Sequence, residues 1–527
     1  MKQSKKNGKT RKIEKSKKLK NIGITERLLI FLTISCLFAV FVFNKNEAVN
    51  SLAVAAAGFC MIAEAAVFLA MNKKLTYENV LILLFLAGFL IRLDYVLYTP
   101  HWVRQHDLGG FEKGTGHAGY IQYFYNQGFH LPDFNPTTVS QFYHPPLHYF
   151  IAGNWMKLLT TLGMSYERAV CSIQYLTLFY SSCCMLVGER ILNALKIDGK
   201  GKITAFCVIA FHPAFIMLAG SINNDMLATL FVLLALYTTI RWYQNSNIKN
   251  ILLVALSIGF GMMTKLSAAL VALPVAFVFL AKFINIIKTK GGWRNYFVQY
   301  CAFGVLCIPL GMWFYIRNYV LYDVPFNFVM KLSSSLDQYI GDLSLSKRLF
   351  SSWDYSFDRV FLCWVSPDCP RSEINPMVSI LKTALFGEWC YPDLIVLSRI
   401  LLWMNVAMVI ISAVAMVYCC VVKIRKREEG MLLTIFLALY QGITYLYFVI
   451  FSIQYPHTCS MDFRYIVPTC VVGAVFIGMM INRLGASIQE KQKNGKEMEI
   501  IVQSSVIIVS ALFGVFSLLL YFMVGIG

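Results

Sequence analysis

The recurrence of long apolar runs constrains this chain more than any other feature of its sequence. Runs of about 17 to 25 residues follow one another from residue 24 to residue 523, and a helix of that length crosses a hydrocarbon core of roughly 30 Å. Hydrophobic residues make up 57% of the chain and charged residues only 14%, so its surface suits lipid better than water. The sequence therefore predicts an all-α polytopic membrane protein in which no stretch forms a separate soluble domain.

The basic residues are arranged as topology signals. The net charge is +19, ten of the 47 lysines and arginines lie within residues 1–20, and most of the others lie in short loops between apolar runs. This pattern is typical of loops that stay on the cytoplasmic side of a membrane. We therefore expect no nucleic acid partner, and we expect residues 1–23 to form a basic cytoplasmic tail that orients the first helix and contacts anionic membrane lipids.

The segment 145–162 decides the topology, because it is apolar enough either to cross the membrane or to lie at its surface. If it crosses, the basic loops that follow it all lie outside; if it does not, they all face the cytoplasm, as the orientation rule requires. We therefore predict a juxtamembrane segment here and about 13 spanning helices. The predicted spans are residues 24–43, 51–71, 77–98, 166–190, 203–220, 225–241, 250–264, 267–283, 297–316, 397–422, 430–452, 463–481 and 499–523.

This topology describes a multi-pass cell membrane protein with a cytoplasmic N-terminus. Its parts are the basic tail 1–23, an additional N-terminal transmembrane hairpin 24–76, a transmembrane core 77–316 that contains a first outer loop 99–165, a large outer loop 317–396 and the C-terminal transmembrane helices 397–527. Short outer turns are predicted at 221–224, 264–265 and 454–462. The polar residues that are unusual for a membrane protein collect on this outer side, so the candidate functional residues are sought there.

The first outer loop contains the strongest candidate for a catalytic group. Asp107, Glu112 and Asp133 lie in it, and Asp107 follows closely after the helix predicted at 77–98. A carboxylate at that place is well positioned to act as a general base on a hydroxyl acceptor at the membrane surface. A solvated loop carboxylate or a helix cap is the alternative for a residue in this position.

Five of the eight histidines lie between residues 105 and 148. His106, His117 and His144 are the candidates for binding a divalent metal, but the spacing of 11 residues between His106 and His117 matches no local ligand motif. A divalent metal therefore stays an open alternative, and no cofactor is predicted with certainty. For His144, a turn imposed by the two prolines that follow it is a serious alternative.

Four positive side chains lie at predicted outer helix ends, where the orientation rule does not explain them. They are Arg92, Lys265, Arg317 and Arg464. A phosphate at headgroup depth is held well by arginine or lysine in partly dehydrated surroundings, because charge-assisted hydrogen bonds are strong there. For Lys265, which lies between two apolar runs, snorkelling to the interface explains the position equally well.

Two short polar motifs occur at other outer helix ends. Asn223-Asn224-Asp225 and Asp462-Phe463-Arg464-Tyr465 each combine an acid with hydrogen-bonding neighbours. Taken singly, each motif is explained by a helix cap or a structural ion pair. Their common position on the outer side favours a shared binding site.

The order of these motifs resembles that of a known family, the bacterial relatives of the dolichyl phosphate mannose protein mannosyltransferases. The aminoarabinose transferase acting on lipid A belongs to the same broad group. The resemblance extends from about Ile91 to Pro468 and implies the type C glycosyltransferase fold, an active site on the non-cytoplasmic side and a polyprenyl phosphate sugar as donor. The motifs that carry it are His144-Pro145-Pro146-Leu147, Asn223-Asn224-Asp225, Thr264-Lys265-Leu266-Ser267, Arg317-Asn318 and Asp462-Phe463-Arg464-Tyr465-Ile466-Val467-Pro468.

The resemblance also implies a catalytic residue, because the family's base is an aspartate of the first outer loop. Asp107 looks like this residue, although relatives often have an Asp-Glu pair where this chain has His106-Asp107-Leu108, and Asp94 and Glu112 remain rivals. We expect Lys265, Arg317 and Arg464 to bind the donor phosphate. The residues expected to bind or support the substrate are His106, His117, His144, Asn224, Asp225, Asp462 and Tyr465.

The implied function is that of an inverting glycosyltransferase. It would move a hexosyl or pentosyl group from a polyprenyl phosphate sugar lipid to a hydroxyl of a protein, a glycolipid or a cell-wall polymer. A lipid or sugar transporter and a polysaccharide polymerase or ligase are the alternatives. The chain shows no inverted repeat of the kind common in transporters, which weakens the first alternative slightly.

Overall fold

A computed structural model of the chain describes residues 23–43, 50–288, 292–351, 359–362, 373–490 and 496–526. The predicted basic tail, apart from residue 23, lies outside this part of the chain. Within the described residues the fold is helical, and the β-type pairings are two isolated bridges, between Gly110 and Thr115 and between Tyr339 and His457. The predicted all-α polytopic fold is confirmed.

Eleven of the described helices, taken with the short turns that lead into them, are long and apolar enough to cross a membrane. A bent pair, α9 (Gly199–Phe211) and α10 (Pro213–Ala219), adds a twelfth span if the two are counted as one, and the bend between them is 43°. The eleven are α2 (Ile24–Val42), α3 (Ser51–Met71), α4 (Tyr77–Tyr98), α8 (Ile173–Ala194), α11 (Asp225–Gln244), α13 (Ala272–Lys288), α14 (Trp293–Tyr322), α17 (Ile395–Lys426), α18 (Met431–Gln454), α19 (Pro468–Glu490) and α20 (Glu497–Val524).

The sequence predicts one span more than these helices provide. The difference is α12 (Ile248–Met262), whose 15 residues extend about 22 Å, less than a hydrocarbon core of roughly 30 Å, although the residues that follow it reach the start of α11, where Asn224 bonds to Thr264. The predicted span 463–481 also begins later, because Phe463–Tyr465 forms the short 3-10 helix η5 and α19 starts at Pro468. The motif from Asp462 to Tyr465 therefore lies in a connection rather than inside a spanning helix.

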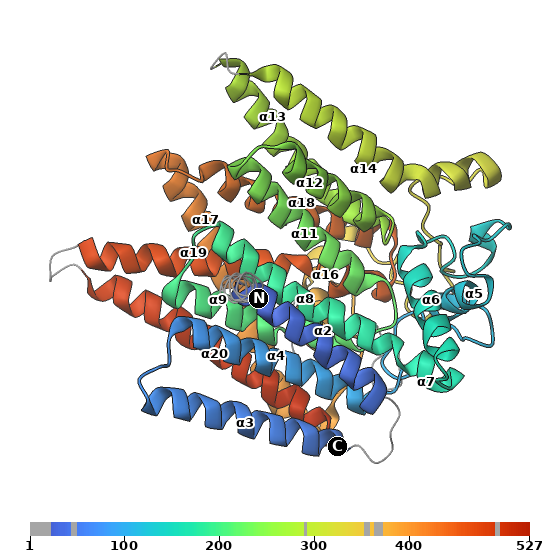
Figure 1. Ribbon diagram of the computed structural model, residues 1–527, viewed down its shortest axis with the longest axis horizontal. Coiled ribbons are helices and arrows are strands. Elements are labelled where there is room, and N and C mark those ends of the chain that lie inside the picture. The colour runs from blue at the N-terminus through green and yellow to red at the C-terminus, as the bar shows by residue number, and fades with distance from the viewer. Residues whose placement is uncertain are drawn as a thin grey trace, which may run out of the picture.

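The short helices of the first outer loop gather at one end of the bundle (Figure 1). The predicted juxtamembrane segment forms α6 (Leu147–Thr161), which packs against α5 (Gly116–Gln127) and is not among the candidate spans. Gly153 allows this close packing, because a Cβ atom there would lie 2.7 Å from the carbonyl oxygen of Ile121. The sequence of α6 is therefore consistent with a helix that packs closely against α5 at the end of the bundle.

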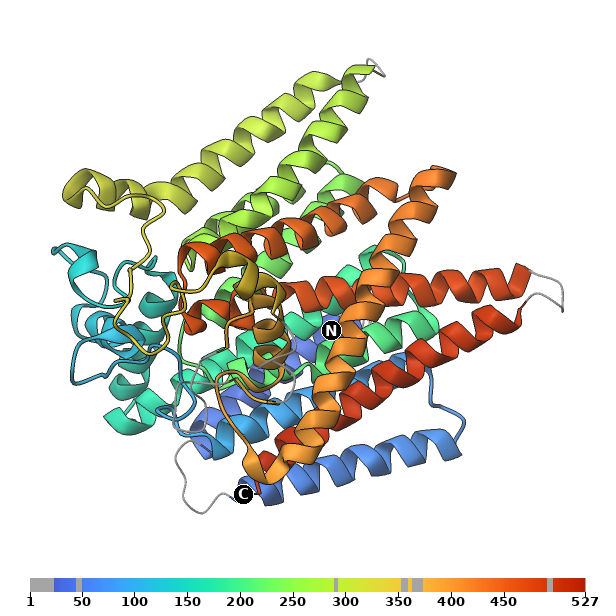
Figure 2. The same cartoon turned by 180° about the vertical axis from the view of Figure 1, so that it is seen from behind.

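The large outer loop lies at the same end, beside the first outer loop (Figure 2). Its backbone is tied to the turn after α18, because the N–H of Ile340 donates to Pro456 at 2.9 Å. Its helix α16 (Pro376–Phe386) packs against η5, where the Thr383 hydroxyl accepts the Phe463 N–H at 2.9 Å. The remaining short helices are α7 (Tyr166–Cys171), α15 (Leu345–Phe350), η1 (Pro136–Thr138), η2 (Leu266–Val271), η3 (Pro392–Leu394) and η4 (Thr458–Met461).

Arg92 lies inside the bundle and is completely buried. Its guanidinium donates to the carbonyl oxygens of Gly88 at 2.7 Å and Ala210 at 2.6 Å. Ala210 belongs to the last turn of α9, where the bend into α10 leaves carbonyl groups without helical partners. Arg92 therefore stabilises the bent pair and is not available to a lipid phosphate.

The additional N-terminal hairpin packs on the outside of the bundle, α2 against α8 and α3 against α4. The hydroxyl of Thr25 in α2 donates to Glu189 of α8 at 2.8 Å. None of the described residues of the hairpin lines the cavity at the end of the bundle.

Candidate functional site

A cavity of about 130 Å³ opens at the bundle end where the outer segments meet. It lies between the first outer loop, the start of α11, η2, the end of α18 and η5. Most of the residues that the sequence singles out line this one cavity. They are Asp107, His117, His144, Asn224, Asp225, Lys265, Arg464 and Tyr465.

Asp107 presents its carboxylate at the edge of this cavity, with about half of the side chain (49%) exposed. Its backbone has a positive φ of 50°, a conformation that costs energy for most residues and that aspartate tolerates better than others. The N-terminus of α5 holds it there, because the His117 N–H donates to the Asp107 carbonyl at 3.2 Å. The loop therefore fixes the direction in which this carboxylate points.

Arg464 is the cation that faces Asp107. Its Nη2 donates to Asp107 Oδ2 at 3.1 Å and to the Tyr465 hydroxyl at 3.1 Å. Burial is the largest single effect on the Asp107 carboxyl and raises its pKa, but the charge and the hydrogen bond of Arg464, together with smaller effects of nearby side chains, outweigh it and lower this pKa to about 2. Asp107 is therefore ionised at neutral pH and is available as a proton acceptor.

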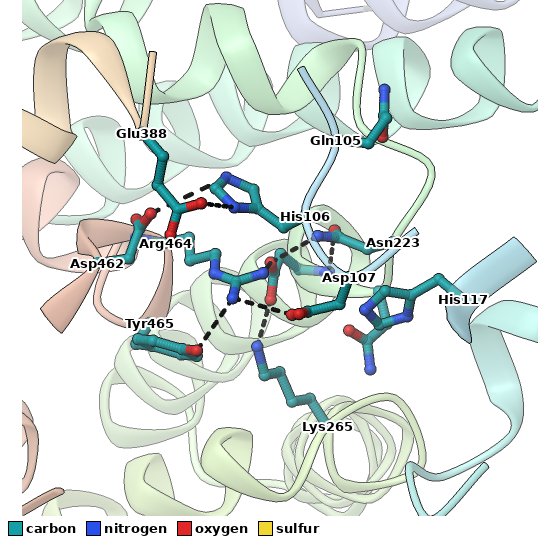
Figure 3. A network of polar contacts seen from close by, with 12 residues as sticks. Gln105, His106, Asp107, His117, Asn223, Lys265, Glu388, Asp462, Arg464 and Tyr465 are labelled. Atoms are coloured by element: carbon teal, nitrogen blue, oxygen red, sulfur yellow. Dashed lines mark hydrogen bonds and ion pairs between the residues drawn. The ribbon is translucent and has the colours of Figure 1, made fainter. Parts of the chain in front are cut away.

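Asp225 and Lys265 form a second ion pair in the same cavity (Figure 3). Asp225 is the first residue of α11, and Asn223 Nδ2 donates to its carboxylate at 2.9 Å. The Lys265 ammonium bonds to Asp225 and lies 4.9 Å from the centre of the Tyr465 ring. Arg464 Nη1 approaches Asp225 to 3.9 Å, so the two ion pairs join into one network of two carboxylates and two cations.

A break between two helices places Lys265 in this cavity. The chain leaves α12 after Met262 and enters η2 at Leu266, and Asn224 Nδ2 donates to the Thr264 carbonyl at 2.8 Å. Interrupted helices expose polar backbone only where protein or a cavity can satisfy it. The break therefore puts an ammonium group in the lining of the cavity.

His117 and His144 lie together on one wall, with their ring centres 5.9 Å apart. Burial lowers the pKa of His117 to about 3 and that of His144 well below its usual value. His117 Nδ1 contacts the Tyr149 hydroxyl at 2.8 Å. Both rings are therefore neutral, and they serve as walls of the cavity rather than as charges.

The predicted metal-binding set of His106, His117 and His144 is not assembled in the described part of the chain. His106 lies on the other side of Arg464, with Asp462 and a residue that the sequence did not single out, Glu388 (Figure 3). Glu388 follows the helix-ending Gly387 of the large outer loop. An acid between that glycine and a tryptophan was the only signal available in the sequence, and it is a weak one.

Arg317, expected at the donor phosphate, does not line the cavity. It lies within α14, and its guanidinium donates to the Pro132 carbonyl at 2.5 Å and to Asn318 at 3.0 Å. The expectation depended on the helix ending at residue 316, whereas α14 continues to Tyr322. The rival bases are also outside the cavity lining, since Asp94 is buried in α4 and Glu112 is exposed on the loop surface.

One wall of the cavity is apolar and aromatic. It is formed by Phe328 and Val329 of the large outer loop and by Tyr447, Phe448 and Phe451 of α18. The cavity therefore combines charged side chains, which suit a phosphate and a sugar, with apolar side chains, which suit a hydrocarbon chain.

Residues 143–313 match the family model described as dolichyl-phosphate-mannose-protein mannosyltransferase. No match is found among curated proteins. A similar solved structure is the archaeal oligosaccharyltransferase AglB from Archaeoglobus fulgidus in complex with an inhibitory peptide and a dolichol-phosphate, with 12% identity, a TM-score of 0.48 and coverage of 84% of this chain and 56% of that chain. Another is ArnT from Cupriavidus metallidurans in the apo state, with 13% identity, a TM-score of 0.44 and coverage of 84% and 75%.

The family-model match bears out, over residues 143–313, the resemblance that the motifs indicated. Three of the motifs, those that begin at His144, Asn223 and Thr264, lie inside the matched stretch. The chain spans little more than half the length of the oligosaccharyltransferase that it matches.

Proposed function

We propose that this protein transfers a sugar, with inversion, from a polyprenyl phosphate to a hydroxyl acceptor at the outer face of the membrane. One observation carries the proposal: the carboxylate of Asp107 and the cations of Lys265 and Arg464 line the same cavity, which also has an apolar, aromatic wall. The outer face follows from the orientation rule, which assigns the basic loops to the cytoplasmic side.

The chemistry needs one carboxylate. Asp107 takes the proton of the acceptor hydroxyl, the oxygen attacks the anomeric carbon, and the bond from that carbon to the phosphate oxygen breaks on the opposite side. A phosphate leaves as a stabilised anion, so no second carboxyl group is needed to protonate it as in many glycosidases. Lys265 and Arg464 neutralise its charge, and Arg317 has no part in this step because its guanidinium is committed to Pro132.

Arg464 links donor binding to the base. Its guanidinium is shared between Asp107, Asp225 and Tyr465. A phosphate that takes one of these N–H groups weakens the ion pair with Asp107, and the weaker ion pair raises the pKa of this carboxyl from its low value. The base therefore becomes a better proton acceptor when the donor is in place.

The apolar wall supports a lipid-linked donor over a soluble sugar nucleotide. Phe328, Phe448 and Phe451 offer a surface for the first isoprenoid units of the carrier, and burying each methylene of such a chain contributes about 0.8 kcal/mol.

The test is donor consumption by the purified protein with a panel of polyprenyl phosphate sugars. We expect Asp107→Asn to lower the rate by about 10²- to 10⁴-fold, the usual contribution of a general base, while the affinity for the donor is retained. Asp133→Asn is the matched control, because Asp133 is an exposed carboxylate of the same outer loop. Transfer by Asp107→Asn at the wild-type rate would contradict the mechanism, and movement of intact donor across the membrane without product would favour the transporter.

A further inference from the structure

We propose that His106, Glu388 and Asp462 form a binding site for a divalent metal ion beside the reaction centre. One nitrogen or oxygen atom from each of these residues lies within 4.8 Å of the others, and they are the one such group of three found in the described part of the chain. The site shares His106 with the histidine set that the sequence suggested, but its other two residues are acids, and none of the three lines the cavity that contains Asp107.

The three side chains come from three segments that the fold brings together. His106 belongs to the first outer loop, Glu388 follows α16, and Asp462 ends the turn after α18. His106 Nδ1 lies 3.3 Å from Glu388 Oε2, and His106 Nε2 lies 3.9 Å from Asp462 Oδ2. Glu388 and Asp462 thus face different nitrogens of the His106 ring, and one ion can bind only one of these nitrogens. A cation about 2.0–2.2 Å from each ligand holds the ligand atoms roughly 3–3.5 Å apart, so the carboxylate that faces the other nitrogen must swing round to the ion to complete the site.

The ligand types indicate the class of metal. One imidazole nitrogen with two carboxylate oxygens suits Zn²⁺ or Mn²⁺ rather than Ca²⁺ or Mg²⁺, which prefer oxygen alone. Three protein ligands leave at least one coordination position for water.

Burial supports a cation at this place. The side chains of His106 and Asp462 are each 4% exposed and that of Glu388 is 19% exposed. Asp462 Oδ2 is buried and has no hydrogen-bond partner within the described residues, although its other carboxylate oxygen accepts the Arg464 N–H at 2.7 Å. Buried carboxylates are costly without a partner charge, and the guanidinium of the neighbouring Arg464 donates instead to Asp107 and Tyr465.

A metal ion here positions the reaction centre without touching the substrate. His106 is the neighbour of Asp107, and Asp462 stands two residues before Arg464. An ion that joins them to Glu388 therefore fixes the base, the phosphate-binding arginine and the large outer loop relative to one another. His106, Glu388 and Asp462 are positioning residues in this account.

The test reads bound metal rather than activity, so it is independent of the proposed transfer reaction. The full-length protein is purified in detergent, stripped with chelator and titrated with Zn²⁺ or Mn²⁺, and the bound ion is counted by mass spectrometry after desalting. We expect one ion per chain and a higher melting temperature on loading. Glu388→Gln keeps the shape of the side chain and is expected to weaken binding about tenfold or more.

His130→Gln is the matched control, because His130 is an exposed histidine of the same outer loop. If the metal binds at the proposed site, this substitution leaves the amount of bound metal unchanged. A second measurement uses Trp389, whose ring centre lies 4.9 Å from that of His106: Mn²⁺ is expected to quench its fluorescence, seen as the difference from Trp389→Phe. The proposal is overturned if the stripped protein takes up neither ion, or if Glu388→Gln binds as much as the wild type. In that case His106 is an imidazolium between two carboxylates.

Discussion

Lys265 and Arg317 both stand next to the outer end of an apolar run, yet their surroundings differ. Lys265 bonds to Asp225 inside the cavity, whereas Arg317 donates to the Pro132 carbonyl outside it. The first is a cation that a donor phosphate can reach, and the second is a tether between α14 and the first outer loop.

The two residues therefore predict opposite results on substitution. Lys265→Met is expected to weaken binding of a polyprenyl phosphate by about 1.5–3 kcal/mol, the usual value of a charged hydrogen bond, which is roughly a 10- to 150-fold rise in Kd. Arg317→Met is expected to leave this Kd unchanged and to lower the melting temperature. Equilibrium binding of a labelled polyprenyl phosphate measures both, and an equal loss of affinity in the two variants would return Arg317 to the donor site.

The candidate site could be predicted from the sequence where its residues interrupt an apolar pattern. Lys265 and Arg464 stand out because a membrane protein rarely places charge at the end of an apolar run without need, and Asp107 stands out because it follows the helix predicted at 77–98. All three line one cavity. Glu388 does not stand out in this way, because it lies among polar and aromatic residues of a loop and not in an apolar run. The residues that lie close to it in the fold, His106 and Asp462, are far from it in sequence, so no local sequence pattern predicts that the three come together.

At the scale of helices, the apolar runs predict the spans well and their ends poorly. The run that becomes α12 looks like a span until the chain turns after Met262, and the run that becomes α14 is longer at its outer end than hydropathy alone indicates. In each case the end is set by contacts with other segments, such as the bond from Asn224 to Thr264. Arg92 shows the same limit, because its partner Ala210 lies at a bend in another helix.

The contact between α5 and α6 gives a prediction for one glycine. Gly153→Ala places a methyl group against the Ile121 carbonyl at 2.7 Å, so the helices must move apart at a cost of about 1–3 kcal/mol. Gly442→Ala is the matched control, because Gly442 of α18 has no atom within 4 Å of such a group and alanine favours a helix by roughly 0.5–1 kcal/mol. The melting temperature is expected to fall for Gly153→Ala and to rise slightly for Gly442→Ala. A Gly153→Ala melting temperature equal to the wild-type value would show that α5 and α6 can move apart at no cost.

At the scale of the whole molecule, two long outer segments and three short turns meet at one end of the helix bundle (Figure 2). The sequence predicted that these segments share a side, because the basic loops alternate with them along the chain. It could not predict which loop residues face one another, since that depends on how the helices pack. The choice of membrane side also rests on charge alone, and it decides whether the donor is taken from the outer or the inner leaflet.

Thiol labelling tests this choice directly in intact cells. Cys390 is exposed on the large outer loop beside Glu388, and an impermeant maleimide added from outside is expected to label it, with Cys390→Ser as the control for the other cysteines. Partial burial raises the pKa of the Cys390 thiol, so the reaction is run at alkaline pH, where more of the thiol is ionised. Glu429→Cys, introduced in the exposed connection between α17 and α18 at the opposite end of the bundle, is expected to react only after the cells are permeabilised. The reverse pattern would place the cavity of Asp107 and Arg464 on the cytoplasmic side, where an outer-leaflet donor has no access to it.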